Sequence, residues 1–187
     1  MNVFDFDNTI YRGDSTVDFV FFNFKKQPSL LRFVPGIVWA YLLHAMHFRN
    51  KTETKQAVFN MFPSIRNIDD RLAEFWETHF TNIKTWYPGV QKEDDVIVSA
   101  GPEFLVTPCC RRLGFKNIIG SRVDPVTGQY SGENCSDEEK VVRFRESFPG
   151  AEIQNFFSDS LSDTPLALLA QQAYLVRGDD FLPWPAS

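Results

Sequence analysis

The chain has 187 residues, of which 43% are hydrophobic and 23% charged, and its formal net charge is −5. This length and composition are typical of a globular protein with one sizeable core and a modest insertion. The acidic balance argues against a nucleic-acid partner, because phosphate backbones are held by clustered Lys and Arg.

The first predicted element is a buried strand over residues 3–6 that leads directly into acidic residues. Asp5 interrupts its apolar side chains, and Asp7 follows before the polar pair Asn8-Thr9, which indicates a turn. Ionised carboxylates at the end of a buried strand need a cation, a metal or hydrogen-bond donors beside them, and a divalent cation would serve both acids. The alternative is that Asp5 borders the core without a function and Asp7 caps a turn.

Residues 15–88 are predicted to be all helical. The stretch 33–48 is the most apolar of the chain, but it is shorter than the ~20 residues of a membrane span. We therefore expect a packed helix there and no membrane contact, with contact to a lipid surface or to acyl chains as the alternative. The helices are expected over 16–26, 28–48, 51–62 and 68–86, the last with the clearest amphipathic spacing.

From residue 89 onward, strands alternate with helices. Strands are expected over 94–99, 117–122, 153–158 and 173–177, and helices over 102–113, from 136 onward and over 164–173. This alternation predicts an α/β fold, a Rossmann-like, doubly wound and mainly parallel sheet that binds ligands outside the carboxyl ends of its strands. We expect a core domain of residues 1–14 and 89–187, with a helical cap domain of residues 15–88 inserted after the first strand.

Further polar residues stand at the ends of these strands. Ser99 closes the second strand, Asp159 and Asp163 follow the fourth, and Lys140 lies near the start of the helix between them. Each has a simpler interpretation when taken alone. Ser99 could terminate a strand, Lys140 could be a solvated helix residue, and Asp163 could cap the helix near Pro165.

The motifs DFDNT, VIVSAG, a lone Lys and SDSLSD, in that order, resemble the haloacid dehalogenase superfamily of phosphotransferases. The helical insertion is similar to that of its phosphoserine phosphatase-like branch, subfamily IB. The resemblance implies a Mg²⁺-dependent phosphatase that hydrolyses a small-molecule phosphomonoester. Asp5 would attack phosphorus and become an aspartyl phosphate, and Asp7 would act first as general acid and then as general base. The Asp5 carboxylate, the Asp7 backbone carbonyl and Asp159 would hold the Mg²⁺.

The same resemblance assigns the remaining polar residues. Thr9, Ser99 and Lys140 would bind phosphate together with backbone N–H groups near Ala100 and Gly101. Asp163 would orient Lys140 or a metal-bound water. In this family many relatives carry Gly at the positions of Asn8 and Ser160.

Asp14 lies nine positions after Asp5, where phosphoserine phosphatases have an acidic residue that meets the substrate amine. This favours a phosphoserine-like substrate, and a helix N-cap is the alternative role of Asp14. The apolar cap leaves a lipid head-group phosphate as an alternative substrate. A non-catalytic phosphate-binding module of the same fold is disfavoured, because Asp5, Asp7, Lys140 and Asp159 are all present and loss of activity usually removes at least one such residue.

The cysteines indicate the compartment. Cys109, Cys110 and Cys135 have no CxxC spacing, and no signal peptide is visible, so we expect a reducing, cytoplasmic environment.

Overall fold

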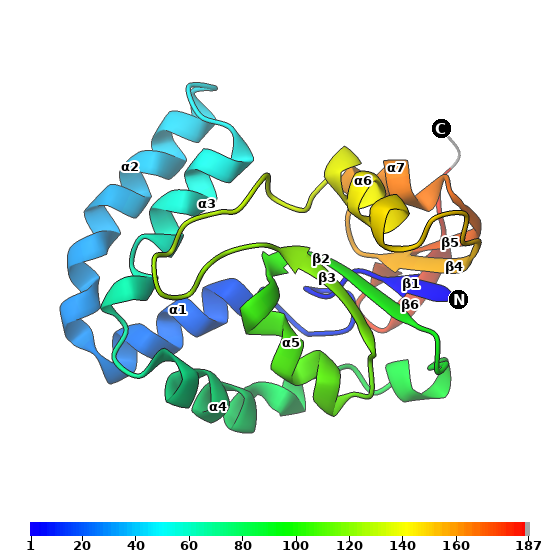
Figure 1. Ribbon diagram of the computed structural model, residues 1–187, viewed down its shortest axis with the longest axis horizontal. Helices are drawn as coiled ribbons and strands as arrows, with labels where there is room; N and C mark the ends of the chain where they lie inside the picture. Colours follow the sequence, from blue (N-terminus) through cyan, green and yellow to red (C-terminus); the bar gives the residue numbers. More distant parts are fainter. Residues whose placement is uncertain (186–187) are drawn as a thin grey trace.

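The computed structural model describes residues 1–185, in which one six-stranded sheet lies beside a group of helices (Figure 1). The strand order is β3-β2-β1-β4-β5-β6, and the first five strands are parallel. β6 runs antiparallel to β5. The strands are β1 (Asn2–Phe4), β2 (Val96–Pro102), β3 (Asn117–Ser121), β4 (Ile153–Ser158), β5 (Ala170–Arg177) and β6 (Asp180–Pro183). The predicted fold class, a mainly parallel α/β sheet, is confirmed, although β6 was not foreseen.

Both faces of the central strands are buried, which explains their continuous apolar sequence. Phe4 and Ile97 belong to one hydrophobic cluster, whereas Val3, Val96 and Val98 belong to the other. Helix α5 (Glu103–Arg112) contributes to the first cluster, and α6 (Glu138–Ser147) and α7 (Thr164–Ala167) contribute to the second. Because the sheet order reverses beside β1, the carboxyl ends of β1 and β4 meet at the topological switch point, where such sheets bind ligands.

Between β1 and β2, a stretch wholly within residues 1–185, the chain forms helices and contributes no strand to the sheet. These helices gather to one side of the sheet (Figure 1). The predicted helix over 28–48 is divided, because Pro35 occupies the first turn of α2, where proline is tolerated. The helices are α1 (Ser15–Lys26), a 3₁₀ segment (Pro28–Phe33), α2 (Val34–Ala45), α3 (Lys51–Phe59) and α4 (Ile68–His79), with short 3₁₀ turns at Phe62–Ser64, Phe80–Asn82 and Tyr87–Gly89.

Two predicted helices are too long. The helix over 68–86 ends at His79, because the backbone at Asn82 and Lys84 bonds to the segment after β1. Arg12 N donates to Asn82 O over 2.9 Å, and Lys84 N donates to Ile10 O over 2.8 Å. The helix over 164–173 ends at Ala167, because β5 begins at Ala170 to pair with β4.

Helix α2 leaves most of its apolar surface exposed. Ala40 is its only fully buried residue, so the expectation of a packed helix is wrong for most of its circumference. Its exposed large apolar side chains are Val38, Trp39, Tyr41 and Leu42. Among residues 1–185, no helix is both long enough and apolar enough to cross a membrane.

Candidate active site

The first two acids lie just beyond β1, at the switch point of the sheet. Asp5 N still donates to Phe157 O of β4 over 2.9 Å, which keeps the backbone at Asp5 paired with β4. The chain then turns at once, with Asn8 in the left-handed region at φ 55°. The side chain of Asp5 is buried and that of Asp7 is partly buried.

A buried cation links the first and last motifs. Lys140 Nζ donates to Asp5 Oδ1 and to Asp163 Oδ2, over 2.7 Å in each case. Asp163 also accepts a hydrogen bond of 2.6 Å from Ser158 Oγ. Since Lys140 is only 2% exposed, its charge is compensated by these two carboxylates and not by solvent.

Burial shifts the pKa values of these groups. Burial raises the pKa of Asp5 to about 6, although the Lys140 ammonium opposes that rise. Burial and the nearby charge of Asp14 raise the pKa of Asp7 to about 7, while Ser15 N, which donates to Asp7 Oδ1 over 2.7 Å, opposes the rise. Burial alone would lower the pKa of Lys140, but Asp5 and Asp163 raise it above its ordinary value. A carboxyl with a pKa near neutrality suits acid–base work at physiological pH.

Thr9 joins the first motif to the last. Its buried hydroxyl donates to Asp5 Oδ2 over 3.3 Å and accepts from the backbone N–H of Asp159 over 3.0 Å. Asp159 is partly buried, and burial followed by the charge of Asp163 raises the pKa of Asp159. The site therefore concentrates negative charge that a cation would neutralise.

The second motif lies against Asp7. A Cβ added to Gly101 would be 3.4 Å from Asp7 Oδ2, so Gly101 borders that carboxylate, and it would be 3.2 Å from Val106 Cγ1 and 3.3 Å from Ser99 Oγ, which would both have to shift. Ser99 is buried, and its Oγ accepts a hydrogen bond of 3.0 Å from Gly101 N. The Ala100 carbonyl faces the helical part of the molecule, where it accepts from Lys55 Nζ.

The predicted Mg²⁺ ligands are two carboxylates, Asp5 and Asp159, and the carbonyl of Asp7. All three are hard oxygen donors, and Mg²⁺ is commonly held by one or two carboxylates with water completing its octahedron. Within the described residues there is no group of three or more His, Cys, Asp or Glu side chains arranged for a metal. The predicted set has only two such side chains, so its composition fits Mg²⁺ and not a metal that needs three or four protein side chains.

Asp14 caps helix α1, as the alternative interpretation of this residue predicts. Its Oδ1 accepts a hydrogen bond of 2.9 Å from Val17 N. The carboxylate also lies close enough to raise the pKa of Asp7, so the cap residue borders the site.

Sequence reasoning missed two lysines at the site. Lys55, on α3, is partly buried, and its Nζ donates to Ala100 O over 3.0 Å and to Asn134 Oδ1 over 3.3 Å. Burial lowers the pKa of Lys55. Lys84 Nζ donates to Asn8 O over 2.5 Å and to Gly178 O over 2.6 Å, which fixes the turn after Asp7. Neither lysine belongs to a motif, and their acceptors are backbone carbonyls or an amide that no sequence pattern marks.

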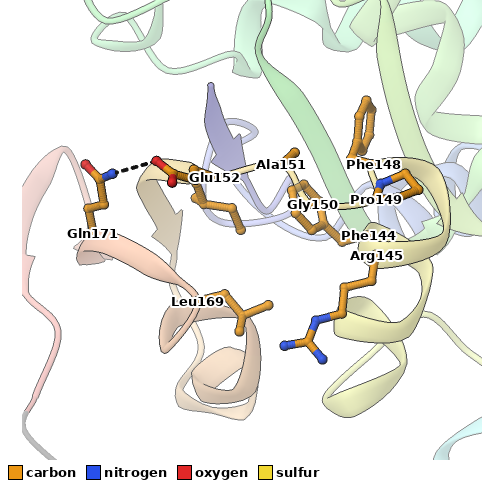
Figure 2. Close-up of a pocket in the computed structure, with 10 residues that line it drawn as sticks. Phe144, Arg145, Phe148, Pro149, Gly150, Ala151, Glu152, Leu169 and Gln171 are labelled. Carbon is orange, nitrogen blue, oxygen red and sulfur yellow. Dashed lines mark hydrogen bonds between the residues drawn. The ribbon is translucent and has the colours of Figure 1, made fainter.

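A cavity of about 510 Å³ lies at the end of the sheet where β4 and β5 begin, opposite the end that carries the buried acids (Figure 2). Its walls include Ile153 at the start of β4 and residues near the start of β5, where Gln171 Nε2 donates to Glu152 Oε2 over 3.3 Å. These are the amino ends of the strands, opposite the buried acids. We therefore do not assign this cavity to the active site.

Residues 3–168 match the family model of the haloacid dehalogenase-like hydrolases, and the chain belongs to this family. It is 28% identical to protein CicA of Caulobacter vibrioides over 189 aligned positions, covering 90% of this chain and 82% of CicA. It is also 30% identical to a histidinol-phosphatase of Neisseria meningitidis over 99 positions, covering 46% of this chain and 45% of that protein.

Solved structures show the same fold. A protein of unknown function from Bordetella pertussis superimposes with a TM-score of 0.75 at 17% identity, covering 94% of this chain and 88% of the other. A phosphoserine phosphohydrolase-like protein from Francisella tularensis gives a TM-score of 0.58 at 16% identity, covering 94% and 87%. The resemblance to the haloacid dehalogenase superfamily and the prediction of a hydrolase are confirmed by the family match, and the phosphoserine phosphohydrolase-like structure shares the fold.

Proposed function

We propose that the protein is a Mg²⁺-dependent phosphatase that hydrolyses a small-molecule phosphomonoester through an aspartyl-phosphate intermediate. The observation that carries the proposal is the Asp5 carboxylate, which Lys140 and Thr9 hold at the carboxyl end of β1 beside Asp7. The histidinol-phosphatase relative and the phosphoserine phosphohydrolase-like structure support phosphomonoester chemistry. The test is phosphate release from a panel of amino-acid, sugar, nucleotide and lipid-head phosphates, with and without Mg²⁺.

The reaction would proceed in two displacements. In the first, an Asp5 oxygen bonds to phosphorus, the bond from phosphorus to the leaving oxygen breaks, and Asp7 gives that oxygen its proton. In the second, Asp7 takes a proton from water, and the water oxygen bonds to phosphorus. The bond between phosphorus and the Asp5 oxygen breaks, which frees the Asp5 carboxylate and inorganic phosphate. The pKa of Asp7, raised by burial to about 7, suits both directions of proton transfer.

The remaining site residues would bind the transferred phosphoryl group. Donors for its oxygens would be Thr9, Ser99, Lys140 and the N–H groups of Ala100 and Gly101. The Thr9 hydroxyl donates to Asp5 and Gly101 N donates to Ser99 Oγ, so binding would exchange these two hydrogen bonds for bonds to the phosphoryl oxygens, whereas Ser99 would donate a proton that its present bond does not use. Asp163 would act as a positioning residue, because it fixes the Lys140 ammonium.

Asp5, the Asp7 carbonyl and Asp159 would hold the Mg²⁺, which would neutralise the charge of the phosphoryl group and of the acids around it. We expect EDTA to abolish phosphate release and added Mg²⁺ to restore it. The measurement is the initial rate at increasing Mg²⁺ after chelation, with excess Ca²⁺ as a control for cation charge alone. Undiminished hydrolysis in EDTA would contradict the metal assignment.

We propose that residues 15–88 form a cap domain over a core of residues 1–14 and 89–187, of which the last two lie outside the described residues. The cap would exclude water and contribute to specificity. Asp14, at the boundary of the two domains, would meet an amine of a phosphoserine-like substrate. The protein would act in the cytoplasm, in keeping with its three buried free thiols.

Asp14→Asn tests this specificity role without removing the helix cap, since Asn caps helices as well as Asp does. We expect the KM for phosphoserine to rise on the order of tenfold, because a charge-assisted hydrogen bond to the amine is lost. The KM for glycerol phosphate, which has no amine, should stay the same. If the KM changes equally for both substrates, Asp14 acts only as the N-cap of α1.

A further inference from the structure

The helical part of the molecule contains an apolar cavity of about 420 Å³ between α1, the 3₁₀ segment, α2 and α3. This volume is within the range of small-molecule binding sites. The residues that line it are Asp14, Thr16, Val17, Val20, Phe21, Phe24, Leu31, Val34, Ile37, Tyr41, Lys55, Val58 and Phe59. Apart from the polar residues Asp14, Thr16 and Lys55 and the hydroxyl of Tyr41, this lining is apolar.

The polar end of the cavity adjoins the buried acids. Asp14 and Thr16 flank Ser15, whose backbone N–H donates to Asp7 Oδ1 over 2.7 Å. Lys55, on the opposite wall, bonds to the Ala100 carbonyl of the second motif. The polar end of the cavity therefore lies beside Asp7 and the second motif, and a molecule with its phosphoryl group at Asp5 would extend towards this space.

The cavity then follows α1 away from the site. The lining residues recur at helical spacing from Asp14 to Phe24, so this wall is roughly 15 Å long at 1.5 Å per residue. Phe21, Leu31 and Tyr41 stand around the cavity, yet each is at least half exposed. An apolar space that stays open to solvent between such side chains is the signature of a ligand groove and not of a packed core.

The chain segment that forms most of the cavity wall is rich in cations, two of which, Lys26 and Lys51, pair with Glu74 and Asp137. No Asp or Glu occurs between Asp18 and Glu53, although the whole chain is acidic. The same stretch carries Lys25, Lys26, Arg32, Arg49 and Lys51. This distribution complements a ligand that combines an apolar chain with an anionic group.

We propose that the cavity receives the apolar chain of the leaving group, so that the substrate is an amphiphilic phosphomonoester. This inference rests on the proposed function, which supplies the phosphoryl site at Asp5. The phosphate lies at the buried acids, and the aliphatic part of the molecule lies along α1, between Val17 and Phe24.

The test uses n-alkylphosphonates from ethyl to decyl, which cannot be hydrolysed, titrated calorimetrically in Mg²⁺ below the concentration at which they form micelles. The dissociation constant should fall two- to fourfold for each added methylene, since each buried CH₂ contributes up to about 0.8 kcal/mol. The gain should stop once the chain reaches the outer end of the cavity. The matching alkyl phosphates are assayed for turnover in parallel.

Tyr41→Gln and Leu42→Gln form a matched pair of variants. The two residues are neighbours on α2 and each is 50% exposed, but only Tyr41 lines the cavity. We expect Tyr41→Gln to flatten the dependence on chain length, whereas Leu42→Gln keeps the wild-type dependence and the wild-type activity. Phe21→Gln, on the facing wall, should act like Tyr41→Gln.

The two proposals fail separately. Hydrolysis of alkyl phosphates with dissociation constants that do not depend on chain length would overturn the cavity assignment and leave the phosphatase standing. Chain-dependent binding without hydrolysis of any phosphomonoester would support the cavity and overturn the phosphatase. If the dissociation constant depends on alkyl chain length equally in Tyr41→Gln and Leu42→Gln, the alkyl chain binds elsewhere and the inference is overturned.

Discussion

Replacing Asp5 by Asn should lower the rate of phosphate release by a factor on the order of 10⁴ or more, the scale at which removal of a nucleophile acts. Asn has nearly the same shape, so the hydrogen bond with Thr9 and the backbone bond to Phe157 can persist. What is lost is the anionic oxygen that would attack phosphorus. The measurement is single-turnover hydrolysis, with acid-quenched wild-type enzyme analysed for phosphate bound covalently to Asp5.

Asp179→Asn is a matched control for this substitution. Asp179 is an exposed partner of Arg12, outside the site, and its replacement should leave both turnover and folding unchanged. If Asp5→Asn releases phosphate at the wild-type rate, Asp5 is not the nucleophile. If the folded wild-type protein releases no phosphate from any substrate of the panel, the result would favour the non-catalytic phosphate-binding module.

Replacing Lys140 by Met should damage both stability and activity. The change leaves Asp5 and Asp163 buried without the cation that bonds to both, and breaking a buried ion pair in this way costs about 3–5 kcal/mol. We also expect phosphate release to fall at least on the order of 10²- to 10³-fold, since one electrostatic donor to the transferred group is lost. Urea unfolding in EDTA measures the first effect, and initial rates in Mg²⁺ measure the second.

The double variant Lys140→Met with Asp163→Asn separates the two effects. Removing the Asp163 charge relieves one of the two uncompensated carboxylates, so the free energy of unfolding should recover in part. Activity should not recover, because the ammonium is still absent. If Lys140→Met unfolds at the same urea concentration as the wild type, Lys140 does not stabilise the buried acids.

Local patterns in the sequence predict the strands and the acid motifs well. The bounds of β4, Ile153–Ser158, agree with the prediction, because an apolar run ends there in polar residues. Asp5, Asp7 and Asp163 lie near one another because parallel strands bring their carboxyl ends to one end of the sheet, and Lys140 reaches Asp5 and Asp163 from the first turn of α6. These features depend on residues close in sequence and on the regular geometry of the sheet.

Features that depend on distant contacts were not predictable. The role of Lys55 follows from the packing of α3, which brings its ammonium to the Ala100 carbonyl 45 positions away. β5 begins at Ala170 and not at Ala173, because pairing with β4 outweighs local helix propensity. The apolar stretch 33–48 gives no sign by itself that α2 stays exposed, since burial depends on what packs against it.

The hydrogen bonds between residues 10–12 and 82–84 have a consequence for the architecture of the chain. They hold the entry and exit of the helical insertion side by side, with Arg12 N bonded to Asn82 O and Lys84 N bonded to Ile10 O. The insertion therefore leaves the core and returns to it at adjacent positions. Inserted segments are tolerated best where their two ends are close together. Recombination at these two points would exchange one helical segment for another and leave β1, its turn and the buried acids in place. The core could then take new substrates without change to its chemistry.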